Sequence, residues 1–154
     1  MNQQKLIKDI LKIYPDIAFK EGDNYYWSPS NQTVYFGNNE TSEGLWALLH
    51  ESGHAILKHI HYYSDIQLVS MELQAWEKAK EIAVSHNIEI DEDHIQDCLD
   101  SYRDWIHKRS LCPDCNLAGL QINTHTYSCV FCNNKWKVST ERFCRPYRRK
   151  TLEK

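Results

Sequence analysis

Two histidines stand four residues apart, with a glutamate directly after the first, in the segment LLHESGHAILKH at residues 48–59. In a helix, His50 and His54 lie on the same face one turn apart, so their imidazoles can bind one zinc ion together. Glu51 is set to one side of that pair, where it can accept a proton from a water in the open coordination position. The pattern therefore predicts a hydrolytic zinc site with Glu51 as general base.

A third zinc ligand is expected outside this segment, because a catalytic zinc ion commonly takes three protein ligands and a water. The metzincin pattern would supply a further histidine, but Leu57 and Ile60 stand where its glycine and histidine belong. Glu72 follows His54 by 18 residues, among apolar residues of a second expected helix. A carboxylate facing inward is costly without a partner, and a metal would supply one. We therefore predict Glu72 as the third ligand; a first-turn glutamate favoured by the helix dipole is the alternative explanation.

Four cysteines form two C-x-x-C pairs, CPDC at residues 112–115 and CVFC at residues 129–132. Two such pairs at this spacing are typical of a tetrahedral structural zinc site. The predicted ligands are Cys112, Cys115, Cys129 and Cys132. The segment resembles a zinc ribbon and is too small to fold on its own core, so the metal is expected to supply folding free energy.

The hydrophobic pattern predicts an α+β chain around these residues. Helices are expected at residues 3–14, from Thr41 or Ser42 to about 63, at about 69–86 and at about 91–109. An aromatic hairpin is expected between the first two helices, with strands at residues 25–27 and 33–36.

Charge is distributed unevenly along the 154 residues. Residues 1–107 carry 8 Lys/Arg and 18 Asp/Glu, whereas residues 108–154 carry 10 and 3. Such a split is typical of two modules with different partners. No apolar run approaches the roughly 18 residues of a membrane span, and the N-terminus lacks the apolar region of a signal peptide. We expect a cytoplasmic protein with no membrane partner.

The segment HESGHAILKH, followed by MELQAWEKA, resembles the ImmA/IrrE-like zinc metallopeptidases over roughly residues 1–107. Their pattern is H-E-x-x-H and then a glutamate with an alanine three residues later. The matching residues are His50, Glu51, His54, Glu72 and Ala75. The resemblance implies a zincin domain of gluzincin type, with a small sheet, an active-site helix and a glutamate-bearing helix. Zincins commonly offer an edge strand with which an extended peptide can pair, so the resemblance makes the strand at residues 33–36 the expected edge strand. Aromatic side chains that simply form part of the core are at least as good an explanation of that strand. It also implies cleavage of a specific protein, often a transcriptional repressor. Trp76 departs from the pattern, because many members have a small polar residue there.

Three segments are therefore expected: a zincin-like metallopeptidase domain at residues 1–109, a zinc ribbon at residues 110–140 and a basic tail at residues 141–154. Basic side chains in the tail can contact phosphates, and an aromatic ring can stack on a base. The candidate residues for binding nucleic acid or a partner are Arg142, Arg145, Tyr147, Arg148, Arg149 and Lys150. A solvated tail that only aids solubility is the alternative.

The order of modules is similar to that of SprT-like proteases, which join a zincin to a C-terminal zinc ribbon and act on DNA-bound proteins. That family takes a third histidine as ligand, and no histidine of this chain stands at a suitable position. Two hypotheses follow. The first is a zinc-dependent endopeptidase, with one catalytic and one structural zinc ion, that cleaves a repressor or a DNA-bound protein. The second is a non-catalytic zinc-binding adaptor or inhibitor of a phage or mobile element, acting through nucleic-acid or protein binding by the ribbon.

Overall fold

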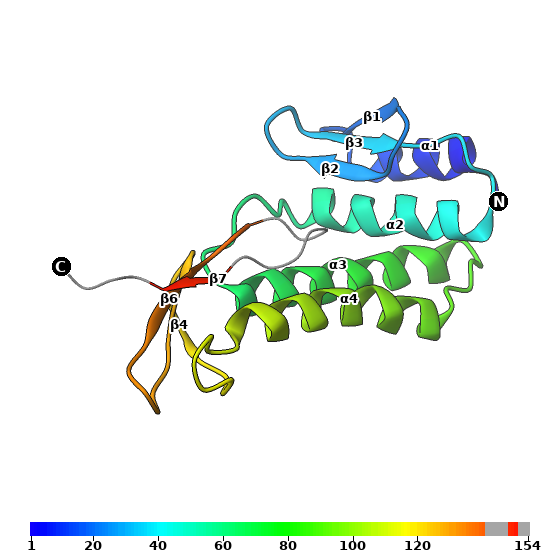
Figure 1. Cartoon of the computed structure of the whole chain (residues 1–154). Coiled ribbons are helices and arrows are strands. Elements are labelled where there is room, and N and C mark those ends of the chain that lie inside the picture. Colours follow the sequence, from blue (N-terminus) through cyan, green and yellow to red (C-terminus); the bar gives the residue numbers. More distant parts are fainter. Residues whose placement is uncertain (141–147, 151–154) are drawn as a thin grey trace. The chain divides into compact units, whose positions relative to one another are not determined.

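The computed structural model describes residues 1–140 and 148–150. In chain order the elements are α1 (Gln3–Ile13), β1 (Ala18–Glu21), β2 (Tyr26–Ser28), β3 (Thr33–Phe36), α2 (Ser42–Ile56), α3 (Asp65–Ser85), α4 (Glu92–Ser110), β4 (Leu120–Asn123), β5 (Thr126–Ser128), β6 (Lys135–Val138) and β7 (Arg148–Lys150) (Figure 1). The described part of the chain is therefore α+β, as the sequence predicted. None of its helices combines the length and the apolarity that crossing a membrane requires.

Two compact units divide the chain. The first comprises Met1–His61 and Ser70–Ile95, and the second comprises Tyr62–Val69 and the described residues of Gln96–Lys154. The first unit contains α1, the sheet of β1, β2 and β3, α2 and most of α3. The second contains most of α4 and the cysteine-rich segment. The predicted ligands His50, His54 and Glu72 thus belong to one unit, and the four predicted cysteine ligands belong to the other.

The sheet of the first unit has the strand order β1-β3-β2. β1 runs parallel to β3, and β2 runs antiparallel to it with Trp27 opposite Val34. The expectation that residues 33–36 form an edge strand is therefore wrong, because β3 lies in the centre and β2 is an edge strand. The error has a physical cause. β1 consists of only four residues, AFKE, and it pairs with β3 in parallel, which is a non-local contact that leaves no turn signal in the sequence.

Local capping sets both ends of α2. The side chain of Thr41 accepts a hydrogen bond from the Gly44 amide at 3.2 Å, which makes Thr41 the N-cap. The helix ends at Ile56, earlier than expected, because Lys58 adopts the left-handed conformation with φ 53°. The amide of His59 then donates to the carbonyl of His54 at 3.0 Å, and the amide of Lys58 donates to Ala55 at 3.1 Å. These two bonds form a Schellman motif, which folds the chain back over the last turn of the helix.

The helix α3 begins at Asp65, a few residues before its expected start, and α4 covers its expected range. Not every apolar residue of α3 is buried, since Leu73 is 40% exposed. The buried residues of this helix include Leu68, Glu72, Ala75, Trp76, Ala79 and Ala83. Glu72 is therefore part of the inward face, as predicted, whereas Glu77 and Glu81 are exposed.

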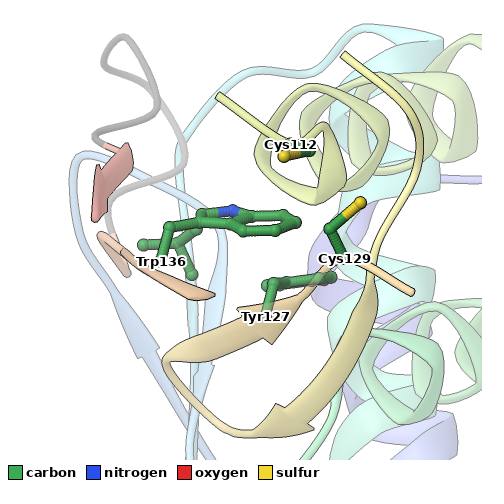
Figure 2. Packing of buried hydrophobic residues seen from close by; sticks show 5 residues of the cluster. Cys112, Tyr127, Cys129 and Trp136 are labelled. Carbon is green, nitrogen blue, oxygen red and sulfur yellow. The ribbon is translucent and has the colours of Figure 1, made fainter. Parts of the chain in front are cut away.

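In the second unit, β4, β5, β6 and β7 form an antiparallel sheet in that order. Its core consists of Cys112, Tyr127, Cys129, Trp136 and Val138. Figure 2 shows the rings of Trp136 and Tyr127 lying one above the other beside Cys112 and Cys129, with ring centroids 5.7 Å apart. Gly119 is required here, because a Cβ at that position would lie 2.3 Å from the indole of Trp136.

A buried polar cluster ties this sheet to the helix ends of the same unit. The hydroxyl of Tyr127 donates to the carboxylate of Asp65, and the guanidinium Nε of Arg109 lies 3.5 Å from that carboxylate. Asp65 and Arg109 are each only 2% exposed. The carbonyl of Arg109 accepts a hydrogen bond from the indole N–H of Trp136 at 3.1 Å. The cysteine-rich sheet therefore shares its core contacts with the first turn of α3 and the last turn of α4.

Candidate metal centres

Three predicted ligands meet between α2 and α3 in the first unit. His50 Nε2 lies 3.1 Å from Glu72 Oε2 and 3.2 Å from His54 Nε2, and His54 Nε2 lies 3.5 Å from Glu72 Oε1. All three side chains are buried. The two imidazoles present the same ring nitrogen to the same carboxylate, so the three groups converge on one point.

The spacing of these atoms fits a tetrahedral zinc ion. Ligand atoms bound at about 2.0–2.1 Å in a tetrahedron lie about 3.3–3.4 Å from one another. The observed separations of 3.1 to 3.5 Å match this edge length. Two histidines and a glutamate also form a ligand set that zinc commonly takes in hydrolytic sites, with a fourth position left for water. The residues therefore fit the metal that the sequence predicted.

A close helix crossing brings Glu72 to the two histidines. A Cβ built on Gly53 would lie 2.4 Å from the carbonyl oxygen of Ala75, closer than real contacts allow. Glycine inside a helix costs about 1 kcal/mol relative to alanine, so its presence has a packing reason. Gly53 lies between Glu51 and His54 on α2, and Ala75 lies one turn beyond Glu72 on α3. The crossing thus sets the distance between the histidine pair and the carboxylate.

Opposing effects act on the pKa of Glu72. Burial raises it, because a charged carboxylate loses hydration there, but the neighbouring imidazoles of His50 and His54 outweigh the burial and hold the pKa below its usual value. The carboxylate is therefore ionised at neutral pH. An ionised carboxylate beside two imidazoles is the form that a divalent cation requires.

The predicted general base points to a different partner. The carboxylate Oε2 of Glu51 accepts a hydrogen bond from the backbone N–H of Trp27 at 2.7 Å. Because this N–H binds Glu51, it faces the open side of β2, which is an edge strand, and not β3. Glu51 does not belong to the converging ligand group of His50, His54 and Glu72.

Stacking with an aromatic ring orients the imidazole of His50. The ring of Trp76 lies parallel to it at a centroid distance of 4.3 Å and an angle of 29°. His50 Nδ1 is buried, and no described residue forms a hydrogen bond with it. Trp76, the residue at which the sequence departs from the ImmA/IrrE-like pattern, therefore contacts a predicted zinc ligand directly.

His54 is oriented by hydrogen bonds that the sequence did not predict. Its Nδ1 lies 2.8 Å from Nδ1 of His59, whose Nε2 lies 3.2 Å from the amide oxygen of Gln74. Burial lowers the pKa of His59, and the neighbouring His54 lowers it further. The sequence offered only one hint of this contact, the presence of a histidine five residues after His54. The contact itself depends on the helix end at Lys58, which the sequence did not predict.

A pocket of about 380 Å³ lies in the same unit. Its lining includes Ile17, Trp27, Pro29, Ala55, Lys58 and Ile60. Trp27 connects the pocket to the predicted general base, since its backbone N–H binds Glu51. Ala55 follows the ligand His54 directly in α2. The pocket thus adjoins the residues of the candidate site, and its lining combines apolar residues with Asp16, Gln32 and Lys58.

The four predicted cysteine ligands converge in the second unit. Sγ of Cys112 lies 3.6 Å from Sγ of Cys132, and Sγ of Cys115 lies 3.5 Å from Sγ of Cys129. A disulfide would need about 2.05 Å, so these are thiols. Tetrahedral zinc with bonds of about 2.3 Å places its sulfur ligands about 3.8 Å apart, close to the observed values. This group also fits zinc.

Backbone amides hold the first cysteine of each pair. Burial raises the pKa of Cys112, but the amides of Cys115 and Asp114 outweigh it and lower the pKa to about 6. The amide of Cys132 in the same way lowers the pKa of Cys129. These amides favour the thiolate, the form that binds zinc, at the first cysteine of each pair. At Cys115 and Cys132 a backbone amide also lowers the pKa, but burial and the neighbouring cysteine thiols outweigh it and raise the pKa.

The predicted tail residues are only partly within the described residues. Arg142, Arg145 and Tyr147 lie outside them. Arg148, Arg149 and Lys150 form β7, in which Arg148 donates to the carbonyl of Leu111 at 2.8 Å. Arg149 pairs directly with Lys137 of β6. The alternation of exposed and buried residues in KWKV places Lys135 and Lys137 on the outer face, and no sequence motif had marked either residue as a candidate.

No protein-family model matches this chain, and no curated protein or solved structure matches it. The resemblance to ImmA/IrrE-like metallopeptidases and the similarity of module order to SprT-like proteases therefore stay predictions from the sequence.

Proposed function

We propose that this chain is a zinc-dependent endopeptidase of ImmA/IrrE-like type, with His50, His54 and Glu72 as zinc ligands and Glu51 as general base. The observation that carries the proposal is the convergence of two imidazole nitrogens and a carboxylate at 3.1 to 3.5 Å in a buried site. A zinc ion bound by these residues supplies Lewis-acid chemistry that makes a water nucleophilic near neutral pH.

The remaining steps belong to side chains of the chain itself. Glu51 accepts the proton of the attacking water and later gives it to the leaving amine, which is general acid–base catalysis by one carboxylate. Glu72 stays ionised and would serve as a zinc ligand. The backbone N–H of Trp27 holds the Glu51 carboxylate at 2.7 Å and so restricts where it can act.

The sheet edge and the adjoining pocket support a proposal for the substrate class. An extended peptide can pair with an edge strand through main-chain hydrogen bonds, and β2 is the edge strand whose backbone reaches Glu51. The pocket lined by Trp27 and Ile60 can accept an apolar side chain of such a peptide. We therefore propose an extended segment of a protein as substrate, such as a repressor or a DNA-bound protein.

The ribbon is proposed to recruit the target. Its outer face carries Lys137 opposite Arg149, two like charges that repel each other unless an anionic partner is present. DNA or an acidic protein surface would supply the opposite charge. In this proposal the ribbon zinc is structural, since its four thiolates leave no open position for water.

The test uses a proteome-derived peptide library incubated with the purified, zinc-loaded chain, with new termini identified by mass spectrometry. Glu51→Gln preserves size and hydrogen bonding but cannot accept the proton. We expect the Glu51→Gln variant to hold two zinc ions per chain and to produce no cleavage. Cleavage by this variant at the wild-type rate would show that the proposed mechanism is wrong.

A second candidate function is a zinc-binding adaptor or inhibitor without catalysis. The observation that favours it is the engagement of Glu51 by the backbone of β2, which would serve equally well as a structural contact. Zinc analysis separates the two functions. Two zinc ions per chain, one of them lost in His50→Ala, favour the peptidase. One zinc ion that His50→Ala leaves in place favours the adaptor.

A further inference from the structure

A continuous chain of polar contacts leads from α3 to the far side of the His54 imidazole. The amide nitrogen of Gln74 donates to Ser70 Oγ at 3.3 Å, and its amide oxygen faces His59 Nε2 at 3.2 Å. His59 Nδ1 then faces His54 Nδ1 at 2.8 Å. Every residue in this chain lies within the first unit.

The proton positions in this chain follow from the donor and acceptor types. An amide oxygen can only accept, so His59 Nε2 must carry the hydrogen. A neutral His59 then has a lone pair on Nδ1, and the hydrogen between the two rings must belong to His54 Nδ1. The lone pair of His54 is therefore on Nε2, the atom that faces His50 and Glu72.

Backbone hydrogen bonds hold His59 beside His54. Its amide donates to the carbonyl of His54 at 3.0 Å within the Schellman motif. Its carbonyl accepts the indole N–H of Trp27 at 2.8 Å. Both backbone polar groups of His59 are thus engaged, one by α2 and one by the edge strand, and the ring is held between His54 and Gln74 by its own contacts.

The two ligand histidines differ in the partner of their Nδ1 atom. His50 Nδ1 has no hydrogen-bond partner among the described residues, and its ring is oriented by Trp76 instead. Stacking fixes the plane of a ring but not which nitrogen carries the hydrogen. Of the two ligand histidines, only His54 therefore has a hydrogen-bond partner among the described residues at Nδ1, the ring nitrogen that does not face the other ligands.

We propose that His59 is a positioning residue that fixes the Nδ1–H tautomer of His54 and thereby raises the affinity of the His50, His54 and Glu72 site for zinc. The inference rests on the metal site of the proposed function, and it assigns His59 no contact with the metal. Partners that orient a ligand histidine are commonly worth about 10- to 100-fold in metal affinity. We expect a loss of that size when His59 can no longer accept a hydrogen bond.

Two substitutions distinguish the effect of the hydrogen-bond acceptor on His59 from the effect of its ring. His59→Phe keeps a ring of similar size but has no acceptor, and His59→Asn places an amide oxygen near the position of Nδ1. Zinc affinity is measured on the full chain by competition with a chromophoric chelator, with the cysteine site as internal reference. We expect His59→Phe to bind zinc at the histidine site about 10-fold or more weakly, and His59→Asn to stay close to wild type.

The matched control is His61→Phe, because His61 is exposed and stands two residues further along the chain. It should leave both zinc sites at wild-type affinity. Equal losses in His59→Phe and His59→Asn, or no loss in His59→Phe, would overturn the role of His59. A wild-type chain that binds zinc only at the cysteines would overturn the proposed metal site itself, which is a distinct result.

A second measurement uses only the wild-type chain and needs no zinc at the histidine site. Long-range ¹H–¹⁵N correlation spectra of wild-type protein with zinc only at the cysteines report which ring nitrogen of His54 carries the hydrogen. We expect the Nδ1–H form. A spectrum in which His54 is in the Nε2–H form would contradict the proposal, whatever the affinities show.

Discussion

The carboxylate of Glu51 accepts a hydrogen bond of 2.7 Å from the backbone N–H of Trp27, and so links the histidine helix to the edge of the sheet. The same tryptophan donates its indole N–H to the carbonyl of His59 at 2.8 Å. One residue of β2 therefore contacts both the predicted general base and the residue that orients a predicted ligand. A peptide pairing with β2 would meet this residue at the centre of the site.

Removing the backbone N–H of Trp27 should weaken catalysis. Trp27→Ala removes the indole and keeps the N–H, whereas Trp27→Pro removes both; the N–H is not used by β3, so proline costs no bond of the sheet. A hydrogen bond to a charged group is worth about 1.5–3 kcal/mol, so kcat is expected to be about tenfold or more lower in Trp27→Pro than in Trp27→Ala. The measurement is kcat on a peptide that the wild type cleaves, at equal zinc content. Equal kcat values would mean that this N–H does not position Glu51.

Adding a single methyl group at Gly53 should push α2 and α3 apart. Alanine is the better helix former by about 1 kcal/mol, but its Cβ would collide with the backbone oxygen of Ala75. Overpacking costs about 1–3 kcal/mol, so we expect Gly53→Ala to lower the free energy of unfolding and to weaken zinc binding at Glu72. Urea denaturation and chelator competition measure the two effects. Ala75→Gly should not rescue the variant, since the collision is with backbone; rescue would mean that the Ala75 side chain, and not its carbonyl oxygen, limits the approach of the helices.

Stability of the second unit should depend on the Tyr127 hydroxyl in a pH-dependent way. Burial raises the pKa of Tyr127, and its hydrogen bond to Asp65 raises it further. A pKa raised on folding contributes stability that is fully present below the ordinary value of about 10 and is lost as the pH rises beyond it. Tyr127→Phe is therefore expected to cost about 1–3 kcal/mol at neutral pH, because it removes a donor from a buried carboxylate.

The difference in free energy of unfolding between wild type and Tyr127→Phe should shrink above about pH 10. There the tyrosine ionises in the unfolded wild type but stays protonated in the folded state, which favours unfolding, and the phenylalanine variant has no such group. Urea unfolding at a series of pH values between neutral and alkaline measures it. Tyr62→Phe, at a half-buried tyrosine of the same unit, is the control. A difference that stays constant across the alkaline range would show that the raised pKa does not contribute to folding.

If the ribbon recruits DNA, the facing cations Lys137 and Arg149 should determine how binding depends on salt. Each phosphate contact that is lost reduces the slope of log affinity against log salt by about 0.9, so Lys137→Glu with Arg149→Glu should reduce it by about 2. Fluorescence anisotropy with a labelled duplex of about 20 base pairs measures the slope. Lys8→Glu, at an exposed lysine of α1, should leave the slope unchanged. An unchanged slope in the double variant would exclude phosphate contacts at this face and favour a protein partner.

The features that the sequence predicted depend on short-range spacing. Two histidines four apart must share a helix face, and a C-x-x-C pair must direct both sulfurs to one side of a tight turn. The period of apolar residues likewise predicted the four helices and the hairpin of β2 and β3, and it placed Glu72 on an inward face. None of these inferences needs contacts between distant segments, and this is why they could be made without coordinates.

Contacts between distant segments, and one helix end without a sequence signal, determined the rest. The position of β3 at the centre of its sheet depends on β1, whose pairing is parallel and non-local. The early end of α2 depends on a left-handed lysine where a glycine would have been the usual signal, and that end brings His59 to His54. Trp27 reaches Glu51 only because β2 packs along α2. Side-chain spacing along the chain encodes which groups can act together, but the partners that orient those groups come from elsewhere in the fold, where hydrophobic packing and strand pairing bring them within hydrogen-bond distance.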